Sequence, residues 1–453
     1  MTQSRLHAAQ NALAKLHEHR GNTCYPHFHL APPAGWMNDP NGLIWFNDPM
    51  SEHWGPMHWG HATSDDMIHW QHEPIALAPG DDNDKDGCFS GSAVDDNGVL
   101  SLIYTGHVWL DGAGNDDAIR EVQCLATSRD GIHFEKQGVI LTPPEGIMHF
   151  RDPKVWREAD TWWMVVGAKD PGNTGQILLY RGSSLREWTF DRVLAHADAG
   201  ESYMWECPDY FEVDGTKILS ASVQGLEGGI WDDRNVYQSG YFLVDGDILE
   251  DYKLSEYQLW DYGFDYYAPQ SFETEDGRRI HISWMGMPDC EEYTNPTIAE
   301  GWQHCFTFPR EVFVEDGKVC QRPVRELQKK KTLVDKSAGM LKKDGYKVYD
   351  VNISGIQNNE FRTVIDEELI LEYKNGRFEM HFTSQDKNSV SAGRGMRYIA
   401  LDSVTDVEIL VDHSSVEVFV NDGEAVFSTR FYPKADSLLV EAEEAQIMMY
   451  EIQ

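Results

Sequence analysis

The chain has 453 residues, of which 41% are hydrophobic and 12% aromatic, and its formal net charge is -37. The acidic excess disfavours nucleic acid and anionic membrane surfaces as partners, and the hydrophobic fraction suffices for real cores. Residues 1–20 lack an apolar signal core, and no run approaches the roughly 18 apolar residues of a membrane span. Seven cysteines without metal-type spacing predict reduced thiols and a cytoplasmic location.

Residues 1–24 are predicted to form a helical leader. Over residues 3–19, Leu6, Ala9, Leu13 and Leu16 recur at the spacing of one helix face. We expect this helix to pack across the main domain.

From residue 25 to residue 327 the helical period vanishes. Short runs rich in β-branched and aromatic residues alternate with turns such as Asn97-Gly98, Asp214-Gly215, Asp245-Gly246 and Asp276-Gly277. These dipeptides are strong hairpin signals, so this region is predicted to be an antiparallel β-domain.

An internal repeat refines this prediction. Ser64-Asp-Asp-Met-Ile-His-Trp70 resembles Ser128-Arg-Asp-Gly-Ile-His-Phe134 and, more weakly, Ser183-Ser-Leu-Arg-Glu-Trp188. Recurrence on the order of 50 residues within short strands is typical of propeller blades. We therefore expect a five-bladed β-propeller over 25–327; a large sandwich would give hairpins without the repeat.

The last part of the chain is predicted to be a separate β-sandwich, residues 335–453. A basic, helical linker from Arg325 to Lys331 precedes it, and its lysines are expected to face solvent. Alternating strands follow, and Asn421-Asp422-Gly423 marks a hairpin among them. The fold class is thus all-β.

The stretch Trp36-Met-Asn-Asp-Pro-Asn-Gly42 is turn chemistry, because the residue before proline avoids the α region and glycine accepts positive φ. Asp39 is held there between polar amides. Such an Asp can simply satisfy its own turn, so its interpretation depends on more distant residues.

Two further stretches place a carboxylate just ahead of a proline. They are Arg151-Asp152-Pro153 and Trp205-Glu206-Cys207-Pro208. Singly, they are as readily an Arg–Asp pair and a partly buried Glu. In a propeller, however, inner strand ends from different blades face one funnel, so Asp39, Asp152 and Glu206 could meet there. Three carboxylates in one small cavity require at least one raised pKa.

This arrangement matches the needs of glycoside hydrolysis, which uses one carboxylate as nucleophile and one carboxylic acid to protonate the leaving oxygen. Glu206 is predicted to be the acid, because its flanking Trp and Cys offer apolar surroundings. Asp39 is predicted to be the nucleophile, because the donors of its turn can hold it ionised. Asp152, kept charged by Arg151, would bind sugar hydroxyls and stabilise positive charge on the ring.

The three stretches resemble the signature motifs of glycoside hydrolase family 32, which contains invertases, sucrose-6-phosphate hydrolases and fructan hydrolases. Further matches are Trp54-Gly-Pro56, Trp59-Gly-His61, Phe89-Ser-Gly-Ser92, Tyr267-Ala-Pro-Gln270 and Asp412-His-Ser-Ser-Val-Glu-Val-Phe419. The resemblance covers nearly the whole chain. It implies a five-bladed propeller with a β-sandwich behind it and a retaining mechanism. It assigns Asp39 as nucleophile, Asp152 as transition-state stabiliser and Glu206 as acid/base.

The resemblance also implies a set of substrate contacts. They are Trp36, Asn38, Trp54, Phe89, Ser90, Arg151, Cys207 and Tyr267. Two departures from the family stand out. Phe46 runs almost directly into Trp54, so the first blade is expected to lack a strand with an aromatic-aromatic-Gln triplet. Pro288 stands where the family often has a Trp, four residues beyond the match to Trp284.

We therefore expect a retaining β-fructofuranosidase that hydrolyses sucrose, sucrose 6-phosphate or short fructans without a cofactor or metal. A catalytically impaired or inactive fructoside-binding relative is the alternative, because of the shortened blade. An inverting arabinan or xylan hydrolase is a further one, distinguished by carboxyl groups about 6.5–9.5 Å rather than about 5–5.5 Å apart. His58 and His61 are expected at a polar rim, and His149 in a structural role. The sequence sets neither the oligomeric state nor the choice among these sugars.

Overall fold

A computed structural model describes residues 2–42, 56–198, 200–226, 235–288, 295–357, 360–387, 389 and 391–453. Apart from one α-helix and two short 3-10 helices, the regular elements in these ranges are β-strands. None of the described helices is long and apolar enough to cross a membrane.

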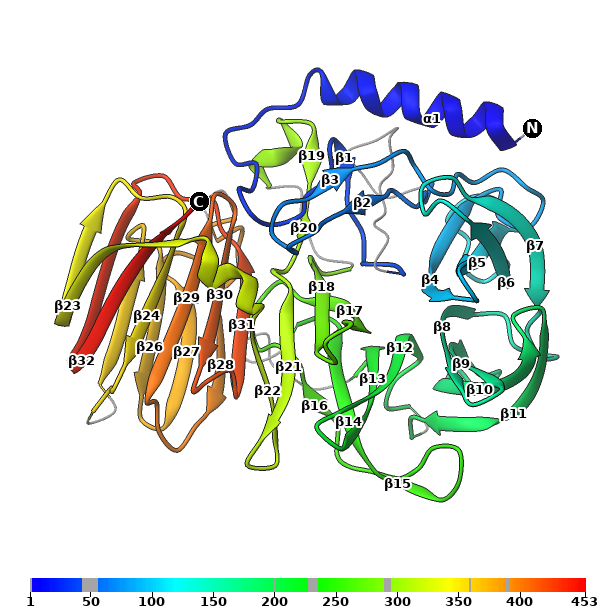
Figure 1. Ribbon diagram of the computed structural model, residues 1–453. Coiled ribbons are helices and arrows are strands. Elements are labelled where there is room, and N and C mark those ends of the chain that lie inside the picture. The colour runs from blue at the N-terminus through cyan, green and yellow to red at the C-terminus, as the bar shows by residue number, and fades with distance from the viewer. Residues whose placement is uncertain are drawn as a thin grey trace.

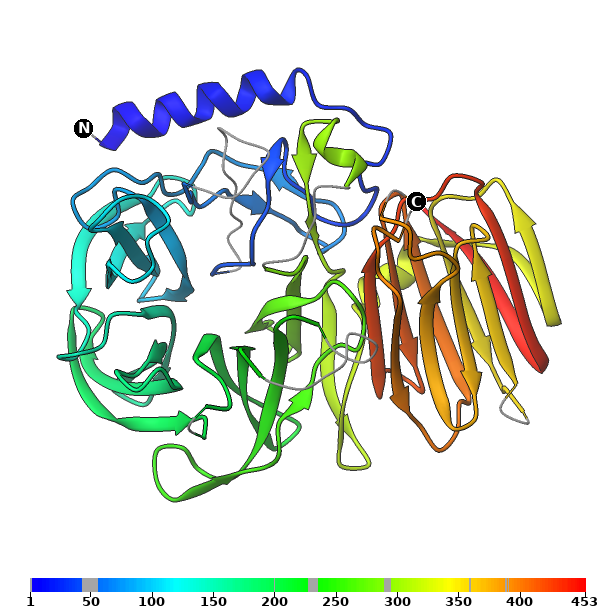
Figure 2. The ribbon, with the colours of Figure 1, turned by 180° about the vertical axis from the view of Figure 1, so that it is seen from behind.

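Four antiparallel sheets follow one another around a common axis (Figures 1 and 2). The first contains β4 (Gly87–Asp95), β5 (Leu100–Trp109), β6 (Ile119–Ser128) and β7 (Glu135–Leu141). The second contains β8 (Phe150–Glu158), β9 (Thr161–Lys169), β10 (Gly175–Ser184) and β11 (Glu187–His196). In both, spatial order follows chain order, as in the blades of a propeller.

The other two sheets have the same plan with one short strand added to each. The third contains β12 (Met204–Val213), β13 (Thr216–Gln224), β14 (Gln238–Gly246) and β15 (Tyr252–Leu254), with β16 (Gln258–Leu259) also on β14. The fourth contains β17 (Tyr267–Glu273), β18 (Arg279–Met285), β21 (Arg310–Glu315) and β22 (Lys318–Pro323), with β20 (Cys305–Phe306) also on β18.

Two small sheets occupy the gap in the ring between the fourth and first blades (Figure 1). β1 (Gly35–Trp36) pairs in parallel with β19 (Trp302–Gln303), which η1 (Pro296–Ile298) precedes; β2 (Ala62–Thr63) pairs with β3 (Gln71–His72). The strand predicted after the Asp39 turn, and with it the predicted shortening of the first blade, lie outside the described residues.

Hairpin chemistry explains several of the connections. Asn97 and Gly98 have φ of 56° and 81° between β4 and β5, and Asp214 and Gly215 have 50° and 77° between β12 and β13. Both central residues of a tight type I′ turn need positive φ, which Asn, Asp and Gly tolerate best. The predicted turn at Asp245-Gly246 is different, because both residues still belong to β14 and the chain reverses after them.

The innermost strand of each blade carries a β-bulge. The register shifts at Phe89/Gly91 in β4, Arg151/Lys154 in β8, Glu206/Asp209 in β12 and Tyr267/Gln270 in β17. In three of them a residue just before a proline has positive φ: Asp152 at 66°, Cys207 at 45° and Ala268 at 51°. Bulges re-aim side chains, and these three lie where the inner strands reach the axis.

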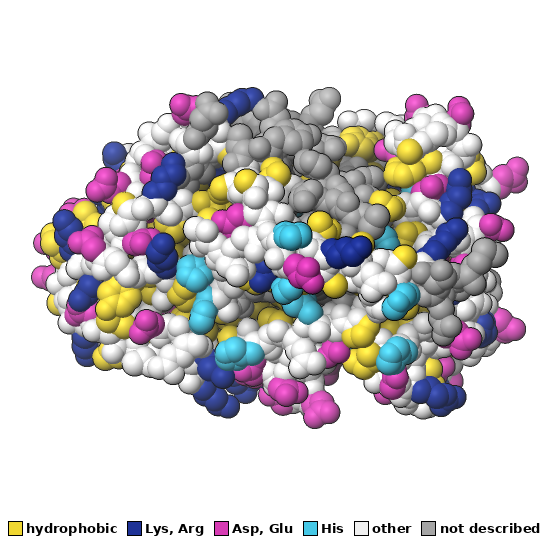
Figure 3. Space-filling model, turned by 90° about the horizontal axis from the view of Figure 1, so that it is seen from above, with side chains coloured by type: hydrophobic (Ala, Val, Ile, Leu, Met, Phe, Trp, Pro, Cys, Tyr) yellow, Lys and Arg dark blue, Asp and Glu magenta, His cyan; other side chains and the backbone are white. Residues whose placement is uncertain are grey.

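The N-terminal helix α1 (Thr2–His17) lies along one edge of the ring (Figures 1 and 2). Arg5 Nη1 donates to the Gly80 carbonyl at 2.6 Å, and Gly21 N donates to the Glu300 carbonyl at 2.8 Å. Viewed from this edge, acidic and basic side chains are interspersed and histidines gather near the middle (Figure 3). The acidic excess of the chain is therefore not concentrated on this face.

The C-terminal strands form one long, folded sheet behind the propeller. Its order is β28 (Met396–Ala400), β27 (Arg377–Phe382), β26 (Leu369–Lys374), β25 (Phe361–Ile365), β32 (Ser437–Ile452), β24 (Tyr349–Ser354), β29 (Asp406–Asp412), β30 (Ser415–Val420) and β31 (Ala425–Arg430), with β23 (Lys331–Asp344) on the other side of β32.

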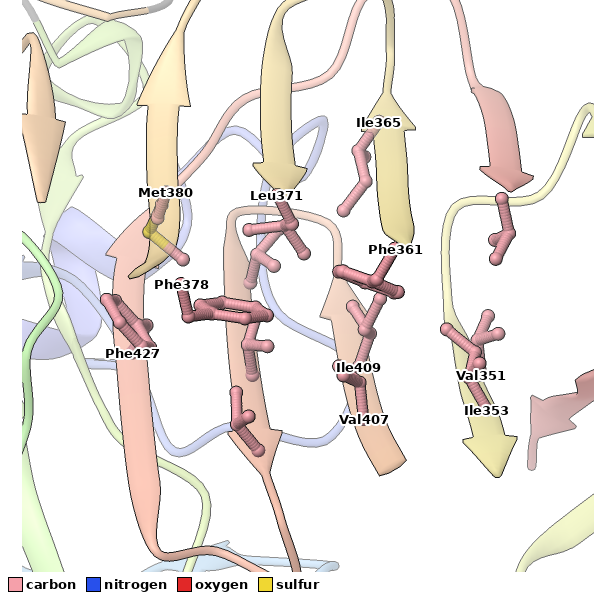
Figure 4. Packing of buried hydrophobic residues seen from close by; sticks show 14 of the residues in the cluster. Val351, Ile353, Phe361, Ile365, Leu371, Phe378, Met380, Val407, Ile409 and Phe427 are labelled. Carbon is pink, nitrogen blue, oxygen red and sulfur yellow. The ribbon is translucent and has the colours of Figure 1, made fainter. Parts of the chain in front are cut away.

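The long strand β32 belongs to both halves of this sheet. Its first part pairs with β25 and its last part with β24. The halves face one another, and Phe361, Leu371 and Phe378 of one pack against Ile409 and Phe427 of the other (Figure 4). All are nearly inaccessible to solvent, so burial of apolar area drives the two layers together.

The linker is a 3-10 helix, η2 (Arg325–Lys329), and the prediction that its lysines face solvent is wrong for Lys331. The Lys331 ammonium is buried in an ion pair with Asp350 and lies 2.8 Å from Glu408. Because Lys331 begins β23 rather than ending the linker, its side chain follows the strand into the sheet.

Candidate active site

The bulged inner strands surround a cavity of about 910 Å³. Every predicted site residue that the structure describes lines it: Trp36, Asn38, Asp39, Phe89, Ser90, Arg151, Asp152, Glu206, Cys207 and Tyr267. The prediction for Trp54 lies outside the described residues. Among the described residues no group of His, Cys, Asp and Glu side chains could hold a metal ion.

The Asp39 turn is fixed to the first blade by side-chain and backbone hydrogen bonds. Asn41 Nδ2 donates to the Asp39 carbonyl at 2.9 Å, and Gly91 N donates to Asn41 Oδ1 at 2.8 Å. Gly42 N, with φ of 52°, donates to the Gly91 carbonyl at 3.2 Å. Gly91 is required there, because a Cβ would lie 2.0 Å from the Ile103 carbonyl oxygen. Asp39 is thus placed by backbone constraints.

The Asp39 carboxylate is buried and accepts several hydrogen bonds. Asn38 Nδ2 donates to Oδ1 at 2.6 Å, and Ser90 Oγ lies 3.0 Å from Oδ1 and 2.8 Å from Oδ2. Burial raises its pKa to about 6, although Ser90 and Asn38 act against that rise. Asp39 is therefore ionised at neutral pH but titrates close to it.

Asp152 is equally buried and is oriented by its positive φ. Its backbone N donates to Thr105 Oγ1 at 3.0 Å, and its Oδ2 accepts from Cys207 N at 3.0 Å. Cys207 Sγ lies 3.7 Å from Asp39 Oδ2, so this residue touches both carboxylates. Burial and the neighbouring Glu206 raise the pKa of Asp152 well above its usual value. The predicted pKa rise in a shared cavity is confirmed.

Glu206 has polar surroundings rather than the predicted apolar ones. Arg151 donates to Oε1 from Nε at 2.9 Å and from Nη2 at 2.7 Å. Gln224 Nε2 and Tyr267 Oη donate to Oε2 at 2.8 and 2.7 Å. The flanking Trp205 packs in the blade core instead, because successive side chains of a strand point to opposite faces.

Arg151 was expected to keep its neighbour Asp152 charged. Its guanidinium instead pairs with Glu206 and, through Nη1 at 3.3 Å, with Glu121. The acid/base candidate and the arginine therefore form one unit, while Asp152 keeps a raised pKa with Arg151 only partly opposing that rise.

Aromatic side chains form much of the remaining wall. Trp36 lies 6.0 Å from Trp284 between ring centroids, and Tyr203 and Tyr237 share a hydroxyl hydrogen bond of 2.8 Å. Pro288, the departure from the family pattern, lines the same cavity. Aromatic faces are suited to the apolar faces of sugars, and the hydroxyls and amides to their edges.

Histidines were placed imperfectly from the sequence. His58 and His61 are buried in the first part of the propeller rather than at a rim, and burial lowers the pKa of both. His149 lines the cavity, with Nδ1 3.1 Å from Arg151 Nη1. It therefore contacts the site although it was expected to be only structural.

Sequence reasoning missed several cavity residues. They are Met57, Cys88, His107, Asp116, Ile119, Glu121, Lys169, Met204, Gln224 and Met287, among others. A signal was available for one of them: Glu121 alternates with Gln123 among the apolar residues of strand β6, and both are buried. Buried polar residues in such a strand indicate an interior polar site.

Carboxyl groups that face one cavity at a propeller axis are the arrangement that a glycoside hydrolase needs. The sequence of the chain matches the model of the glycosyl hydrolases family 32 N-terminal domain over residues 29–323 and that of the family 32 C-terminal domain over residues 362–448. The chain belongs to glycosyl hydrolase family 32.

Individual relatives agree with this assignment. A sucrose-6-phosphate hydrolase of Escherichia coli is 60% identical, over 96% of this chain and 95% of the relative. A raffinose invertase of Escherichia coli is 50% identical, over 96% and 94%. Among solved structures, a Bombyx mori family 32 β-fructofuranosidase superposes with a TM-score of 0.88 at 29% identity, covering 100% of this chain and 99% of the other.

Proposed function

We propose that the protein is a retaining β-fructofuranosidase that hydrolyses sucrose or sucrose 6-phosphate to fructose and glucose or glucose 6-phosphate. The observation that carries this proposal is the convergence of Asp39, Asp152 and Glu206 on one cavity. Cys207 donates hydrogen bonds to both aspartates, from its backbone N to Asp152 and from its thiol to Asp39. The names of the E. coli relatives support the substrate class, as does the Bombyx mori variant solved in complex with sucrose. Nothing in these comparisons favours an inactive relative.

In the first step, a carboxylate oxygen of Asp39 attacks the anomeric carbon of the fructosyl unit. The bond from that carbon to the bridging oxygen breaks, and protonated Glu206 gives its proton to this oxygen, so the glucosyl part leaves as an alcohol. The hydrogen-bond donors to Asp39 keep the nucleophile in place. Hydrogen bonds from Arg151, Gln224 and Tyr267 stabilise the negative charge that remains on Glu206 after it has given up its proton.

In the second step, Glu206 acts as a base. It takes a proton from water, the water oxygen attacks the same carbon, and the bond to Asp39 breaks, which restores both carboxyl groups. Asp152 binds hydroxyls of the ring, and the resemblance to the family also assigns it the stabilisation of the positive charge on the ring, a role that needs its carboxylate form. Asn38, Phe89, Ser90 and Arg151 form part of the wall of the fructose subsite.

The phosphorylated and unphosphorylated sugars differ by a dianion, which needs a cationic contact. Among the described residues of the cavity, Arg151 and Lys169 carry positive charge, and Arg151 is already paired with two carboxylates. We therefore propose Lys169 as the contact if sucrose 6-phosphate is the substrate. Lys169→Gln would then lower kcat/KM for sucrose 6-phosphate much more than for sucrose.

The proposal includes a fifth blade built from β1, β2, β3 and β19. The repeated segment supports it: Asp66 and Asp130 each accept from the backbone N of a histidine three residues later at 2.8 Å and from its Nδ1 at 2.8 Å. These segments connect β2 to β3 and β6 to β7, the third and fourth strands of a blade. The domain limits 1–24, 25–327 and 335–453 remain part of the proposal.

A cytoplasmic location also belongs to this proposal. The six cysteines among the described residues carry free thiols, which suits a reducing compartment. Expression in cells followed by fractionation tests it.

The decisive experiment compares turnover of sucrose and sucrose 6-phosphate by the purified protein and by Glu206→Gln. We expect release of fructose from at least one sugar and a loss of about 10³-fold or more in the variant. Folded wild-type protein that releases fructose from neither sugar would contradict the proposal. NMR of the released fructose before mutarotation tests retention, and inversion would instead favour the arabinan- or xylan-hydrolase type.

A further inference from the structure

Glu121 is a buried carboxylate to which the proposed mechanism gives no task. It lies on β6, the third strand of the first blade, and its side chain is 1% exposed. Its Oε2 accepts from Phe150 N at 2.8 Å and from Arg151 Nη1 at 3.3 Å, and its Oε1 lies 3.1 Å from His107 Nδ1. All of its partners are cavity residues or precede one directly.

Through Oε2, Glu121 is connected to the acid/base candidate by way of Arg151. Arg151 gives Nε and Nη2 to Glu206 and Nη1 to Glu121, so the two glutamates hold opposite sides of one guanidinium. A planar guanidinium with its donors shared in this way has little freedom to rotate. The position of Arg151 relative to Glu206 thus depends on Glu121.

Through Oε1, Glu121 is connected to the wall of the cavity by way of His107. The His107 ring stacks on Phe89, with centroids 4.1 Å apart and planes 3° from parallel. The hydrogen bond from His107 Nδ1 to Glu121 fixes the plane of this imidazole, and the stack then fixes the Phe89 ring. Phe89 itself faces the cavity beside Ser90.

We propose that Glu121 is a positioning residue that holds Arg151 against Glu206 and, through His107, holds Phe89 against the substrate. This inference rests on the proposed function and extends it to the machinery behind the cavity wall. One carboxylate thereby couples the proton-transferring group to the sugar-binding surface.

The charge of Glu121 has a predictable effect on proton transfer. Burial alone would raise its pKa, but Arg151 and His107 outweigh burial and hold the pKa at about 2, so the group is an anion. Other charged or titratable groups around Arg151 and Glu121 are Asp152, His149, Lys169 and Asp116. With Glu121 neutral, the Arg151 guanidinium would pair with Glu206 alone, so we expect the basic limb of the kcat/KM profile to lie at lower pH.

The experiment measures kcat/KM for sucrose against pH in wild type and in Glu121→Gln and Glu121→Asn. We expect the basic limb of the profile to shift to lower pH by about 1 unit and kcat to fall about 10- to 100-fold. Glu121→Asp keeps the charge and is expected to keep the limb in place with a smaller loss of kcat.

Asp209→Asn is the matched control. Asp209, on the inner strand β12, is likewise buried and paired, with Lys154 at 3.1 Å, but it is not among the described residues that line the cavity. We expect it to lower stability without moving the limb. Folded Glu121→Gln or Glu121→Asn with an unmoved limb would overturn the proposal, as would an equal shift in Asp209→Asn.

If neither neutral variant folds, His107→Gln decides. It leaves the charge of Glu121 in place and removes the stack on Phe89, so KM for sucrose should rise severalfold with the limb unmoved. An unchanged KM overturns the proposal. Wild-type protein that hydrolyses neither sucrose nor sucrose 6-phosphate would instead overturn the proposed function itself, and the two failures are thereby distinguished.

Discussion

The cavity and the contact between the propeller and the C-terminal sheet both bury carboxylates, but they treat them in opposite ways. At the contact, His29 lies 2.8 Å from Asp412 and 2.7 Å from Glu417, and Arg310 pairs with Glu417 and with Asp261. In the cavity, Asp39 and Asp152 have hydrogen bonds but no ion pair with a cation among the residues that the structure describes.

The pKa values follow from this difference. Despite burial, His29 and backbone N–H donors lower the pKa of Asp412 to about 2, whereas burial raises that of Asp39 to about 6. Equal burial therefore yields opposite proton affinities, depending on whether a cation is supplied. At the contact, paired charges join the propeller to the C-terminal sheet. In the cavity, Asp39 and Asp152 keep the raised pKa values that burial gives them, and such values suit catalysis.

Asp39→Asn should produce the largest effect and separates activity from stability. We expect kcat to fall roughly 10⁴-fold or more, because the nucleophile is gone. At about pH 8 the free energy of unfolding should rise by about 2 kcal/mol, because a buried anion with a raised pKa is replaced by a neutral amide. Urea titrations measure the second quantity. A variant less stable than wild type would contradict the conclusion that burial of the Asp39 carboxylate costs stability.

Glu417→Gln tests the opposite region. It leaves Arg310 and His29 without their shared anion, so we expect a loss of about 3–5 kcal/mol in the free energy of unfolding with kcat nearly unchanged below the melting temperature. Glu424→Gln, which removes a more exposed partner of Lys318, is the control and should cost less than about 1 kcal/mol. Equal losses in both would contradict the assigned role of the contact.

His29 makes the contact dependent on pH. Its two carboxylate partners outweigh burial and raise its pKa from 6.5 to about 9. The stabilisation is therefore fully present below about pH 6.5 and is lost as pH rises through about 9. We expect the stability difference between wild type and His29→Gln to shrink by about 2 kcal/mol over this window. A constant difference in urea unfolding at both ends would show that His29 does not titrate there.

The smallest predicted effect is the acid limb of activity. Because Asp39 must be ionised to attack and its pKa is raised to about 6, kcat/KM for sucrose should fall about tenfold per pH unit below that value. Initial rates in a buffer series measure it. A profile that stays flat down to about pH 4 would mean that the nucleophile is not the buried Asp39.

Much of the site could be predicted from short-range turn chemistry and from the resemblance to the family. The turn at Asp39 and the prolines after Asp152 and Cys207 mark places where regular pairing stops, and such places are visible in sequence. The partners of these residues were predicted less well. Arg151 precedes Asp152 but pairs with Glu206, 55 residues away.

The reason is the geometry of a strand. Adjacent residues point to opposite faces, so Trp205 says nothing about the surroundings of Glu206. The alternation of Glu121 with Gln123 indicates a buried polar site, but its partners Phe150 and Arg151 belong to the neighbouring blade and could not be predicted. The buried Lys331 was missed in the same way, since its partners Asp350 and Glu408 lie on distant strands.

The positive φ values at Asp152, Cys207 and Ala268 have a consequence for how this site can change. In three consecutive inner strands, the regular pairing is interrupted by a residue with positive φ that directly precedes a proline. The main chain therefore shapes the cavity as much as the side chains do. Wall residues can be exchanged to suit another leaving group while this framework stays fixed. The prolines take no part in proton transfer, but this framework constrains them as much as it constrains the carboxylates beside them.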